Sequence, residues 1–268
     1  MDQPPDSTAQ LRVTRIHREG AAERRDDTVA REVQLRIVVN DRELAVASVL
    51  PGQECEFTYG FLLTSGLIER ANAVRGWQFD AERGVAFVEL AGDAPLADFA
   101  APPVALGTAC GSEPLTVSSH RLSPIESDLC VHPQAILRAA DALREDSVLF
   151  RETGGVHSVA LCDSDGATLL RAEDIGRHNA CDKLIGAALL GGEIDPARCF
   201  MMSTGRLSSE MVTKAWRLGV PLLASRSAPT SRAVEIAESA RLTIVGFVRA
   251  RRFNIYCWPR RVAGGEPC

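Results

Sequence analysis

Residues 171–186 hold the densest chemistry in the chain, because they combine carboxylates, arginines, a histidine, an asparagine and one of only two lysines. From Asn179 onward apolar residues recur at helical spacing, which predicts a helix with Asn179 as N-cap and Asp182 in its first turn. Arg177 and His178 then lie just before a helix N-terminus, where free backbone N–H groups favour anions. An ordinary strand-to-helix turn with a solvated charge cluster is the alternative interpretation.

Two further predicted turns, residues 203–208 and 225–230, also place an arginine beside small hydroxyl side chains. These arginines are Arg206 and Arg226. In an open α/β sheet such turns meet at the carboxyl edge of the strands, where ligands bind. Three helix N-termini and three guanidinium groups at one edge predict a site for a phosphate or pyrophosphate. The basic patch is extended by residues after the last predicted strand: Arg249, Arg251 and Arg252.

The eight cysteines contain no Cys-x-x-Cys pair, so their spacing predicts neither a zinc ribbon nor a thioredoxin-type dithiol. Most lie in apolar runs, where a cysteine is usually a small buried hydrophobe. Cys110 is different, because it lies in the small, flexible stretch 107–114. A thiol in that setting can be exposed and can approach the active site of a partner. An incidental loop cysteine is the alternative.

The composition, 46% hydrophobic and 24% charged with a net charge of −5, is that of a soluble globular protein. The net charge does not favour non-specific nucleic-acid binding. The N-terminus lacks the basic and apolar regions of a signal peptide, and no apolar run approaches the roughly 18 residues needed to span a membrane. We therefore expect a cytoplasmic protein with reduced cysteines that binds neither nucleic acid nor membrane.

Residues 1–10 are predicted to be a disordered tail and residues 11–90 a smaller α+β N-terminal domain. Alternating patterns predict strands at 11–17, 32–39, 43–49, 77–80 and 84–90, with a helix at 53–68. Asn40 and Asp41 form a favourable hairpin turn between two of these strands. Residues 91–127, rich in proline and alanine at their start, are predicted to be a linker that includes the Cys110 loop.

Residues 128–262 are predicted to form a C-terminal domain, followed by a tail at 263–268. A helix at 132–144 and a loop at 151–157 precede two strands at 158–162 and 167–171. After the helix that starts at Asn179, strands and helices alternate at 199–202, 210–218, 220–224, 233–240 and 242–247, the last strand. This alternation predicts an α/β domain with a parallel or mixed sheet and crossover helices, in a chain that is α+β overall.

With these residues assembled, the C-terminal half resembles the formate dehydrogenase accessory sulfurtransferase family. The matching segments are Thr153-Gly-Gly-Val-His157, Glu173-Asp-Ile-Gly-Arg-His-Asn-Ala180 with Asp182-Lys183, Ser203-Thr-Gly-Arg206, Ser225-Arg-Ser-Ala-Pro-Thr230 and Gly246-Phe-Val-Arg249. The resemblance implies a cytidine-deaminase-like C-terminal domain, a mixed sheet with helices on both faces. The zinc deaminase pattern of His-x-Glu with Pro-Cys-x-x-Cys does not occur, so we expect no zinc and no metal ligand.

The resemblance also implies a function. Family members take sulfur from a cysteine desulfurase as a persulfide and pass it to the molybdenum bis-(molybdopterin guanine dinucleotide) cofactor of formate dehydrogenase. A GDP-like guanine nucleotide would mimic that ligand, and the resemblance implies a homodimer. Cys110 would carry the sulfur. The residues expected to bind the cofactor are Gly154, Gly155, His157, Arg177, His178, Asn179, Asp182, Lys183, Ser203, Gly205, Arg206, Ser225, Ser227, Phe247, Arg249, Arg251 and Arg252.

The chain departs from the family pattern at one place, because the usual Cys-x-x-Cys before the C-terminal domain is reduced to Cys110. Either Gly107 replaces the first family cysteine or Glu113 replaces the second. A dithiol relay is excluded, which leaves a single-cysteine persulfide carrier or a chaperone that binds the cofactor without transferring sulfur. A nucleotide hydrolase that uses His157, His178 or Asp182 is a third alternative.

Overall fold

The computed structural model describes residues 7–92, 104–106 and 122–265, and within these ranges it contains three β-sheets. The predicted sulfur carrier, Cys110, lies outside the described residues, as do Gly107 and Glu113. No described helix is both long and apolar enough to cross a membrane.

The largest sheet has six strands in the order β13-β12-β11-β10-β8-β9. Strands β10, β11 and β12 are parallel, whereas β8 runs antiparallel to both β10 and β9. The carboxyl ends of β9 through β12 and the start of β8 therefore meet at one edge. The sheet comprises β8 (His157–Cys162), β9 (Thr168–Asp174), β10 (Phe200–Ser203), β11 (Leu222–Ser225), β12 (Thr243–Arg249) and β13 (Arg252–Cys257).

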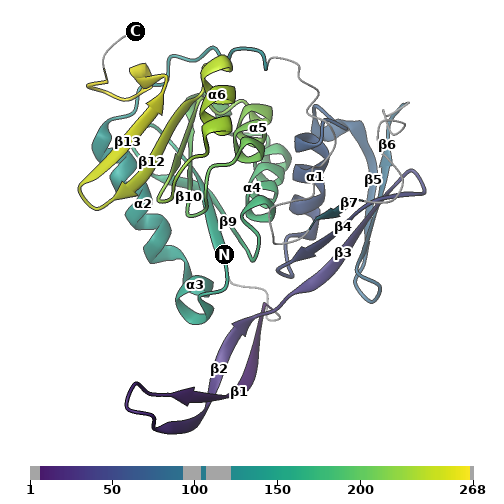
Figure 1. The fold of residues 1–268 in the computed structure, drawn as a ribbon. Helices are drawn as coiled ribbons and strands as arrows, with labels where there is room; N and C mark the ends of the chain where they lie inside the picture. Colours follow the sequence, from purple (N-terminus) through teal and green to yellow (C-terminus); the bar gives the residue numbers. More distant parts are fainter. Residues whose placement is uncertain (1–6, 93–103, 107–121, 266–268) are drawn as a thin grey trace.

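Helices cover both faces of this sheet, as Figure 1 shows. The alternation of side chains along β10 explains the two layers, because successive residues point to opposite faces. Phe200 and Met202 pack in the cluster that contains α2, whereas Met201 packs in the cluster that contains α4 and α5. The expected mixed sheet with helices on both faces is confirmed. The helices are α2 (Pro133–Asp146) and α3 (Val148–Thr153), then α4 (Arg177–Gly191), α5 (Ser209–Leu218) and α6 (Ser231–Ser239).

The N-terminal part forms a five-stranded sheet, β5-β6-β3-β4-β7, with helix α1 (Glu54–Thr64) against it. Asn40 and Asp41 both have positive φ angles, 45° and 63°, which is the conformation expected of the predicted hairpin turn. The strands are β3 (Val33–Val39), β4 (Arg42–Val49), β5 (Val74–Asp80), β6 (Val85–Leu90) and β7 (Val104–Leu106). Short 3₁₀ turns occur at Ala71–Ala73, Pro196–Arg198 and Pro259–Arg261.

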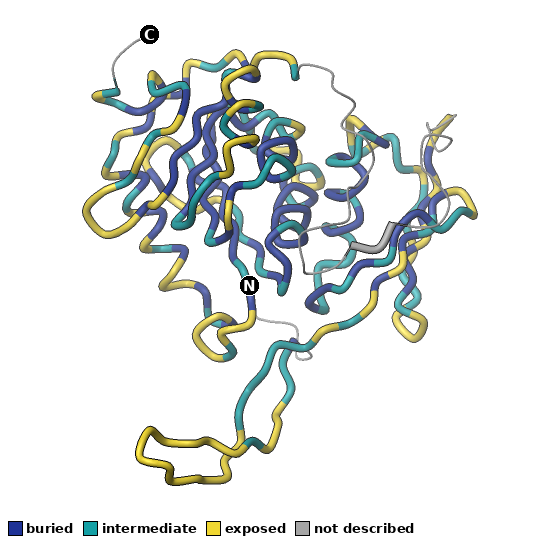
Figure 2. The backbone as a smooth tube through the Cα atoms, viewed as in Figure 1, coloured by how far each residue is buried: buried dark blue, intermediate teal, exposed yellow. Residues whose placement is uncertain are grey.

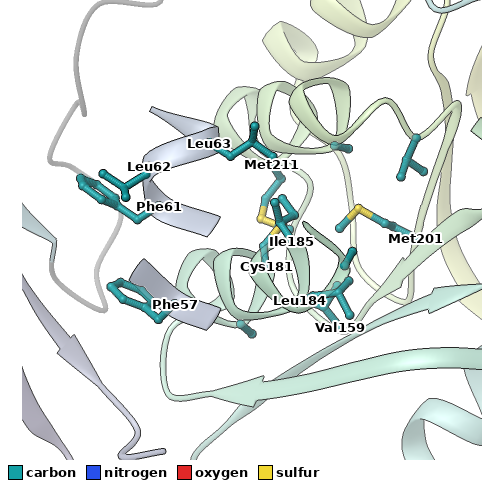
Figure 3. Packing of buried hydrophobic residues seen from close by; sticks show 14 of the residues in the cluster. Phe57, Phe61, Leu62, Leu63, Val159, Cys181, Leu184, Ile185, Met201 and Met211 are labelled. Atoms are coloured by element: carbon teal, nitrogen blue, oxygen red, sulfur yellow. The ribbon is translucent and has the colours of Figure 1, made fainter. Parts of the chain in front are cut away.

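Helices α1 and α4 pack backbone against backbone through two glycines. A Cβ atom at Gly60 would overlap the carbonyl group of Asp182, and one at Gly186 would overlap the carbonyl group of Glu56. Because these pairs run in opposite directions along the two helices, α1 and α4 are antiparallel. Figure 3 shows the helix that carries Phe57 and Phe61 next to the helix that carries Cys181 and Ile185, with the two phenylalanine rings on the side of α1 that faces away from Cys181 and Ile185. The two parts of the chain therefore share one hydrophobic core.

Strands β1 (Thr8–Ile16) and β2 (Ala22–Ala30) form a separate two-stranded sheet, hereafter the arm, which projects from the body (Figure 1). The expected tail at 1–10 is wrong from Ser7 onward. Ser7 is buried, its carbonyl accepts a hydrogen bond from the Arg31 N–H at 2.9 Å, and β1 begins at the next residue.

Several other boundaries differ from the sequence prediction. Helix α4 begins at Arg177 with Gly176 as N-cap, so Asn179 and Asp182 lie inside the helix rather than at its cap. Helix α3 includes residues 151–153, the start of the loop expected at 151–157, and β7 lies in the expected linker. Strand β13 was missed, although its less exposed residues, Phe253, Ile255 and Cys257, alternate with the exposed Arg252, Asn254 and Tyr256.

Candidate functional site

Two neighbouring pockets lie at the carboxyl edge of the large sheet, and they share Arg144, Thr204 and Arg226. The first, here the His157 pocket, has a volume of about 470 Å³. The second, here the Phe247 pocket, has a volume of about 680 Å³. The His157 pocket is lined further by Ser147, Phe150, Gly154, Gly155, Val156, His157 and Ile175. The Phe247 pocket is lined further by Asp141, Ser227, Ala228, Phe247, Arg249 and Ala250.

His157 is positioned by the pairing of β8 with β10. The Thr204 N–H donates to the Ser158 carbonyl at 3.0 Å, and the Ser158 N–H donates to Thr204 Oγ1 at 3.1 Å. Thr204 Oγ1 also lies 3.3 Å from His157 Nδ1. Burial lowers the pKa of His157, the nearby Arg177 lowers it further, and Asp174 opposes the shift. The imidazole is therefore suited to hydrogen bonding as a neutral ring at neutral pH.

Gly154 and Gly155 bring backbone to the rim of the His157 pocket. Gly154 ends helix α3 in the left-handed conformation, with φ of 66°, and its N–H donates to the Phe150 carbonyl at 2.8 Å. This conformation favours glycine because it has no Cβ. The Phe150 side chain, 48% exposed, stands on the same rim. The pocket thus offers a flat apolar ring beside backbone groups and Arg226.

Phe247 supplies a second exposed ring, in the other pocket. Its φ of 53° is unusual for a bulky residue, and its N–H donates to the Ser227 carbonyl at 2.9 Å. The Arg249 guanidinium lies 5.7 Å from the ring centroid, within the range of a cation–π contact. Each pocket therefore pairs an exposed phenylalanine ring with guanidinium groups, an arrangement suited to a planar ring that carries phosphates.

The buried hydroxyls of Ser203 and Ser225 shape the turns instead of facing a ligand. Ser203 Oγ accepts a hydrogen bond from the Gly205 N–H at 3.1 Å. Ser225 Oγ donates to the Gly205 carbonyl at 2.6 Å and accepts from the Ser227 N–H at 2.9 Å. Both serines are fully buried. Their contribution to the site is therefore to fix the backbone conformation of the turns that contain Gly205 and Ser227.

The three arginines that opened the sequence argument lie at the same edge, but in different environments. Arg177 is buried at the start of α4 and packs on Gly205, where a Cβ atom would lie 2.8 Å from the Arg177 Cβ. Arg206 is exposed. Arg226 lines both pockets. Arg251 and Arg252 are exposed around the turn between β12 and β13.

Three residues expected to bind the cofactor are instead buried between α4 and the N-terminal part. Lys183, 1% exposed, places Nζ 2.9 Å from Asp174 Oδ2 and donates to the Leu50 carbonyl at 2.7 Å. Asn179 Nδ2 donates to the Ser48 carbonyl at 2.7 Å. These contacts correct the sequence interpretation, because the side chains hold the fold together and do not face either pocket.

Asp182 is the third of these residues. Its carboxylate accepts hydrogen bonds from Lys214 Nζ at 2.6 and 2.8 Å and from Thr64 Oγ1 at 2.8 Å. Burial raises the pKa of Asp182, and the contact with Lys214 opposes that shift. With its oxygens engaged, Asp182 does not act as the general base of a nucleotide hydrolase.

His178 is also held within the protein. Its Nε2 lies 3.1 Å from Glu210 Oε2 and 3.2 Å from Ser208 Oγ. Burial lowers the pKa of His178 to about 3, with further lowering by nearby cations that include Arg177 and Lys214. The neutral ring can donate from Nε2 to Glu210, so His178 links the starts of α4 and α5. The described residues contain no group of three or more potential metal-ligating side chains.

Several pocket residues were absent from the expected site. Arg144 was predicted only as the end of a helix, and Phe150 was not assigned to any element. Thr204 and Arg226 belonged to the predicted anion-binding turns, although they were not among the residues expected to bind the cofactor. All four residues lie near the ends of strands or helices, and the order of the strands in the sheet brings these ends together. Hydrophobic periodicity alone does not reveal that order.

Comparisons with known proteins agree with this architecture. Residues 30–263 match the model of the FdhD/NarQ family. The chain is 34% identical to "Sulfur carrier protein FdhD" of Bacillus pumilus over 96% of this chain and 98% of that protein. It is 38% identical to the protein of that name in Halalkalibacterium halodurans, over 89% of each chain.

A comparison with solved structures also finds a similar protein. The fold is similar to a crystal structure of a putative formate dehydrogenase accessory protein from Desulfotalea psychrophila, with a TM-score of 0.79 and 28% identity. The match covers 95% of this chain and 99% of that one. The family match, the curated relatives and the shared fold together establish that this chain belongs to the FdhD/NarQ family.

Proposed function

We propose that this protein is a sulfur carrier that serves formate dehydrogenase. It takes sulfur from a cysteine desulfurase as a persulfide on Cys110 and delivers it to the molybdenum bis-(molybdopterin guanine dinucleotide) cofactor. The names of its relatives support the sulfur-carrier role, since several are called sulfur carrier proteins. We further propose that the protein acts in the cytoplasm as a homodimer.

The paired pockets are the observation that best supports cofactor binding. A ligand with two guanine dinucleotide arms carries two flat bases and several phosphates. The two pockets carry two exposed rings, Phe150 and Phe247, with the guanidinium groups of Arg144 and Arg226 shared between them. Charge-assisted contacts from these arginines would hold the phosphates. The rings would stack on planar bases, with Arg249 beside one of them.

The properties of the other cysteines favour Cys110 as the sulfur-carrying thiol. Burial raises the pKa of Cys162 to about 12 and that of Cys199 to about 11, so both remain protonated and poorly nucleophilic. Cys181 and Cys257 are also buried with raised pKa values. Cys130 is exposed, and it therefore provides the matched control for any experiment on Cys110.

The loading step is a thiol exchange. The Cys110 thiolate attacks the outer sulfur of the desulfurase persulfide, a new S–S bond forms on Cys110, and the desulfurase thiolate leaves. Neither protein is oxidised or reduced overall, because the sulfane sulfur moves from one thiol to another. A single cysteine is sufficient for this step, so the reduction of the family Cys-x-x-Cys pair to Cys110 is compatible with it.

A cofactor chaperone without sulfur transfer is the second candidate, favoured by the loss of one loop cysteine. A complementation experiment distinguishes the sulfur carrier from the chaperone. In a host that lacks its own family member, we expect the wild type and Cys130→Ala to restore formate dehydrogenase activity. We expect Cys110→Ala to fail while it still binds GDP in calorimetry. Full restoration by Cys110→Ala would favour the chaperone, and absence of GDP binding by the wild type would contradict both candidates.

A further inference from the structure

One acidic side chain lines the Phe247 pocket. Among the described residues that line the two pockets, Asp141 of α2 is the one carboxylate, and it belongs to the Phe247 pocket alone. The other charged residues of that pocket are basic: Arg144, Arg226 and Arg249. A carboxylate repels phosphate, so the binding of an anion does not explain its presence beside three arginines. Asp141 therefore indicates a ligand group of a different kind at its end of the pocket.

The Asp141 carboxylate is available to a ligand. Helix α2 buries one side and exposes the other, so buried and exposed segments alternate along it in Figure 2, and Asp141 lies on the exposed side. Within the described part of the chain, no hydrogen bond or ion pair engages its side chain. Arg144, three residues further along α2, instead lies 3.6 Å from Glu145. An ionised carboxylate only accepts hydrogen bonds, and its two oxygens fit two adjacent N–H donors.

The exposed ring of Phe247 in the same pocket indicates which donors these are. A planar base that stacks on this ring presents its hydrogen-bonding edge to the surrounding side chains. Guanine carries two adjacent donors on that edge, N1–H and the 2-amino group. Adenine places an acceptor next to its donor, and xanthine has a carbonyl oxygen in place of the 2-amino group. Guanine is therefore the purine that a carboxylate matches best.

We propose that Asp141 selects guanine in the Phe247 pocket by accepting hydrogen bonds from N1–H and the 2-amino group. The selection rests on the nucleotide binding proposed above, and it also orients the ligand. The base lies at the Asp141 end, and the phosphates lie toward Arg144 and Arg226, which the two pockets share. Asp141 is thus a specificity-determining residue, whereas the arginines hold any nucleoside diphosphate.

Three nucleoside diphosphates that differ only at position 2 of the base test this role, by titration calorimetry with the full-length protein. GDP has an amino group there, inosine diphosphate a hydrogen and xanthosine diphosphate a carbonyl oxygen. We expect wild type to bind GDP at least about tenfold more tightly than either of the others. Asp141→Asn should lose this preference and bind xanthosine diphosphate more tightly than wild type does, because the amide N–H donates to the carbonyl oxygen. That gain also excludes misfolding.

The sign of the change separates hydrogen bonding from general electrostatics. Removal of a negative charge beside three arginines should strengthen the binding of every diphosphate, whereas loss of the two hydrogen bonds weakens the binding of GDP. Glu145→Gln removes the same charge from the same helix outside both pockets, and it should keep the wild-type preference.

Equal affinity of wild type for GDP and inosine diphosphate would overturn the role of Asp141 and leave the nucleotide site intact. An unchanged preference in Asp141→Asn, or tighter binding of GDP by that variant, would overturn it in the same way. A wild type that binds none of the three nucleotides would contradict the proposed function itself, and the selection of guanine with it.

Discussion

Lys183 in helix α4 places its ammonium group 2.9 Å from the carboxylate of Asp174 at the end of β9, and both side chains are buried. Asp174 also accepts hydrogen bonds from the N–H groups of Gly176 and Leu50, each at 3.0 Å. One carboxylate thus joins the start of the helix at the candidate site to the end of β4. The pair explains why the N-terminal part and the site form one unit.

Removal of the Lys183 charge should therefore destabilise the whole protein. Lys183→Met leaves Asp174 as a buried carboxylate without its cation, and loss of one partner of a buried pair costs about 3–5 kcal/mol. Denaturant unfolding measures the change. Arg232→Ala is the control, because Arg232 and Glu235 form an exposed pair, and its loss should change stability by less than about 1 kcal/mol. Equal effects of the two variants would contradict the structural role of Lys183.

The close contact between α1 and α4 should make the stability of the protein sensitive to a substitution at Gly186 but not at Gly191. In Gly186→Ala the new methyl group overlaps the Glu56 carbonyl, so the helices must separate, at a cost of about 1–3 kcal/mol. Gly191→Ala, at the end of the same helix, meets open space. Because alanine favours helix more than glycine does, that control should be neutral or stabilising by up to about 1 kcal/mol. Thermal unfolding of both proteins tests the prediction, and an unperturbed Gly186→Ala variant would contradict the close packing.

Arg226 should contribute to nucleotide binding, because it lines both pockets, as Arg144 does. Loss of its charge-assisted contacts should weaken GDP binding by about 1.5–3 kcal/mol, roughly a 10- to 150-fold change in dissociation constant. Titration calorimetry compares Arg226→Ala with Arg232→Ala, which removes an exposed arginine on α6. Unchanged affinity in Arg226→Ala would remove this residue from the binding site.

The partly buried histidines His157 and His178 should make the protein sensitive to acid. His178 has a pKa lowered to about 3, and burial also lowers the pKa of His157. Because each binds a proton more readily in the unfolded chain, stability is lost as the pH falls below the unfolded value of about 6.5. The slope of unfolding free energy against pH between about 3 and 6.5 should be smaller in His178→Gln than in wild type. His17→Gln, on the exposed arm, should keep the wild-type slope.

Periodicity predicted most of the fold, since the strand and helix alternation after residue 198 reproduces β10 through β12 within a few residues. The sheet edge that gathers Arg177, Arg206 and Arg226 follows from that alternation. Strand β2 was not specified, because its sequence from Glu23 to Asp27 is charged on both faces and has no apolar period. It is a strand because it pairs with β1 rather than because it buries a face.

The site was only partly predictable, for a physical reason. A charged residue in a sequence is read as solvated or as a ligand, whereas Asp182 and Lys183 are buried with partners distant in sequence. Lys214, which holds Asp182, lies 32 residues away, and Leu50, which holds Lys183, lies 133 residues away. Such pairs become visible only once α1 and α4 are packed together. The pocket residues Arg144 and Phe150 are likewise assembled by tertiary structure.

Sulfur labelling of Cys110 tests the central claim most directly. The wild type is incubated with a cysteine desulfurase and cysteine, and persulfide is then located by mass spectrometry of peptides. We expect an added sulfur on the peptide that contains Cys110 in wild type and in Cys130→Ala, and none at that position in Cys110→Ala. A wild type without persulfide on Cys110, or equal total labelling of Cys110→Ala, would contradict the proposal that this protein carries sulfur on Cys110.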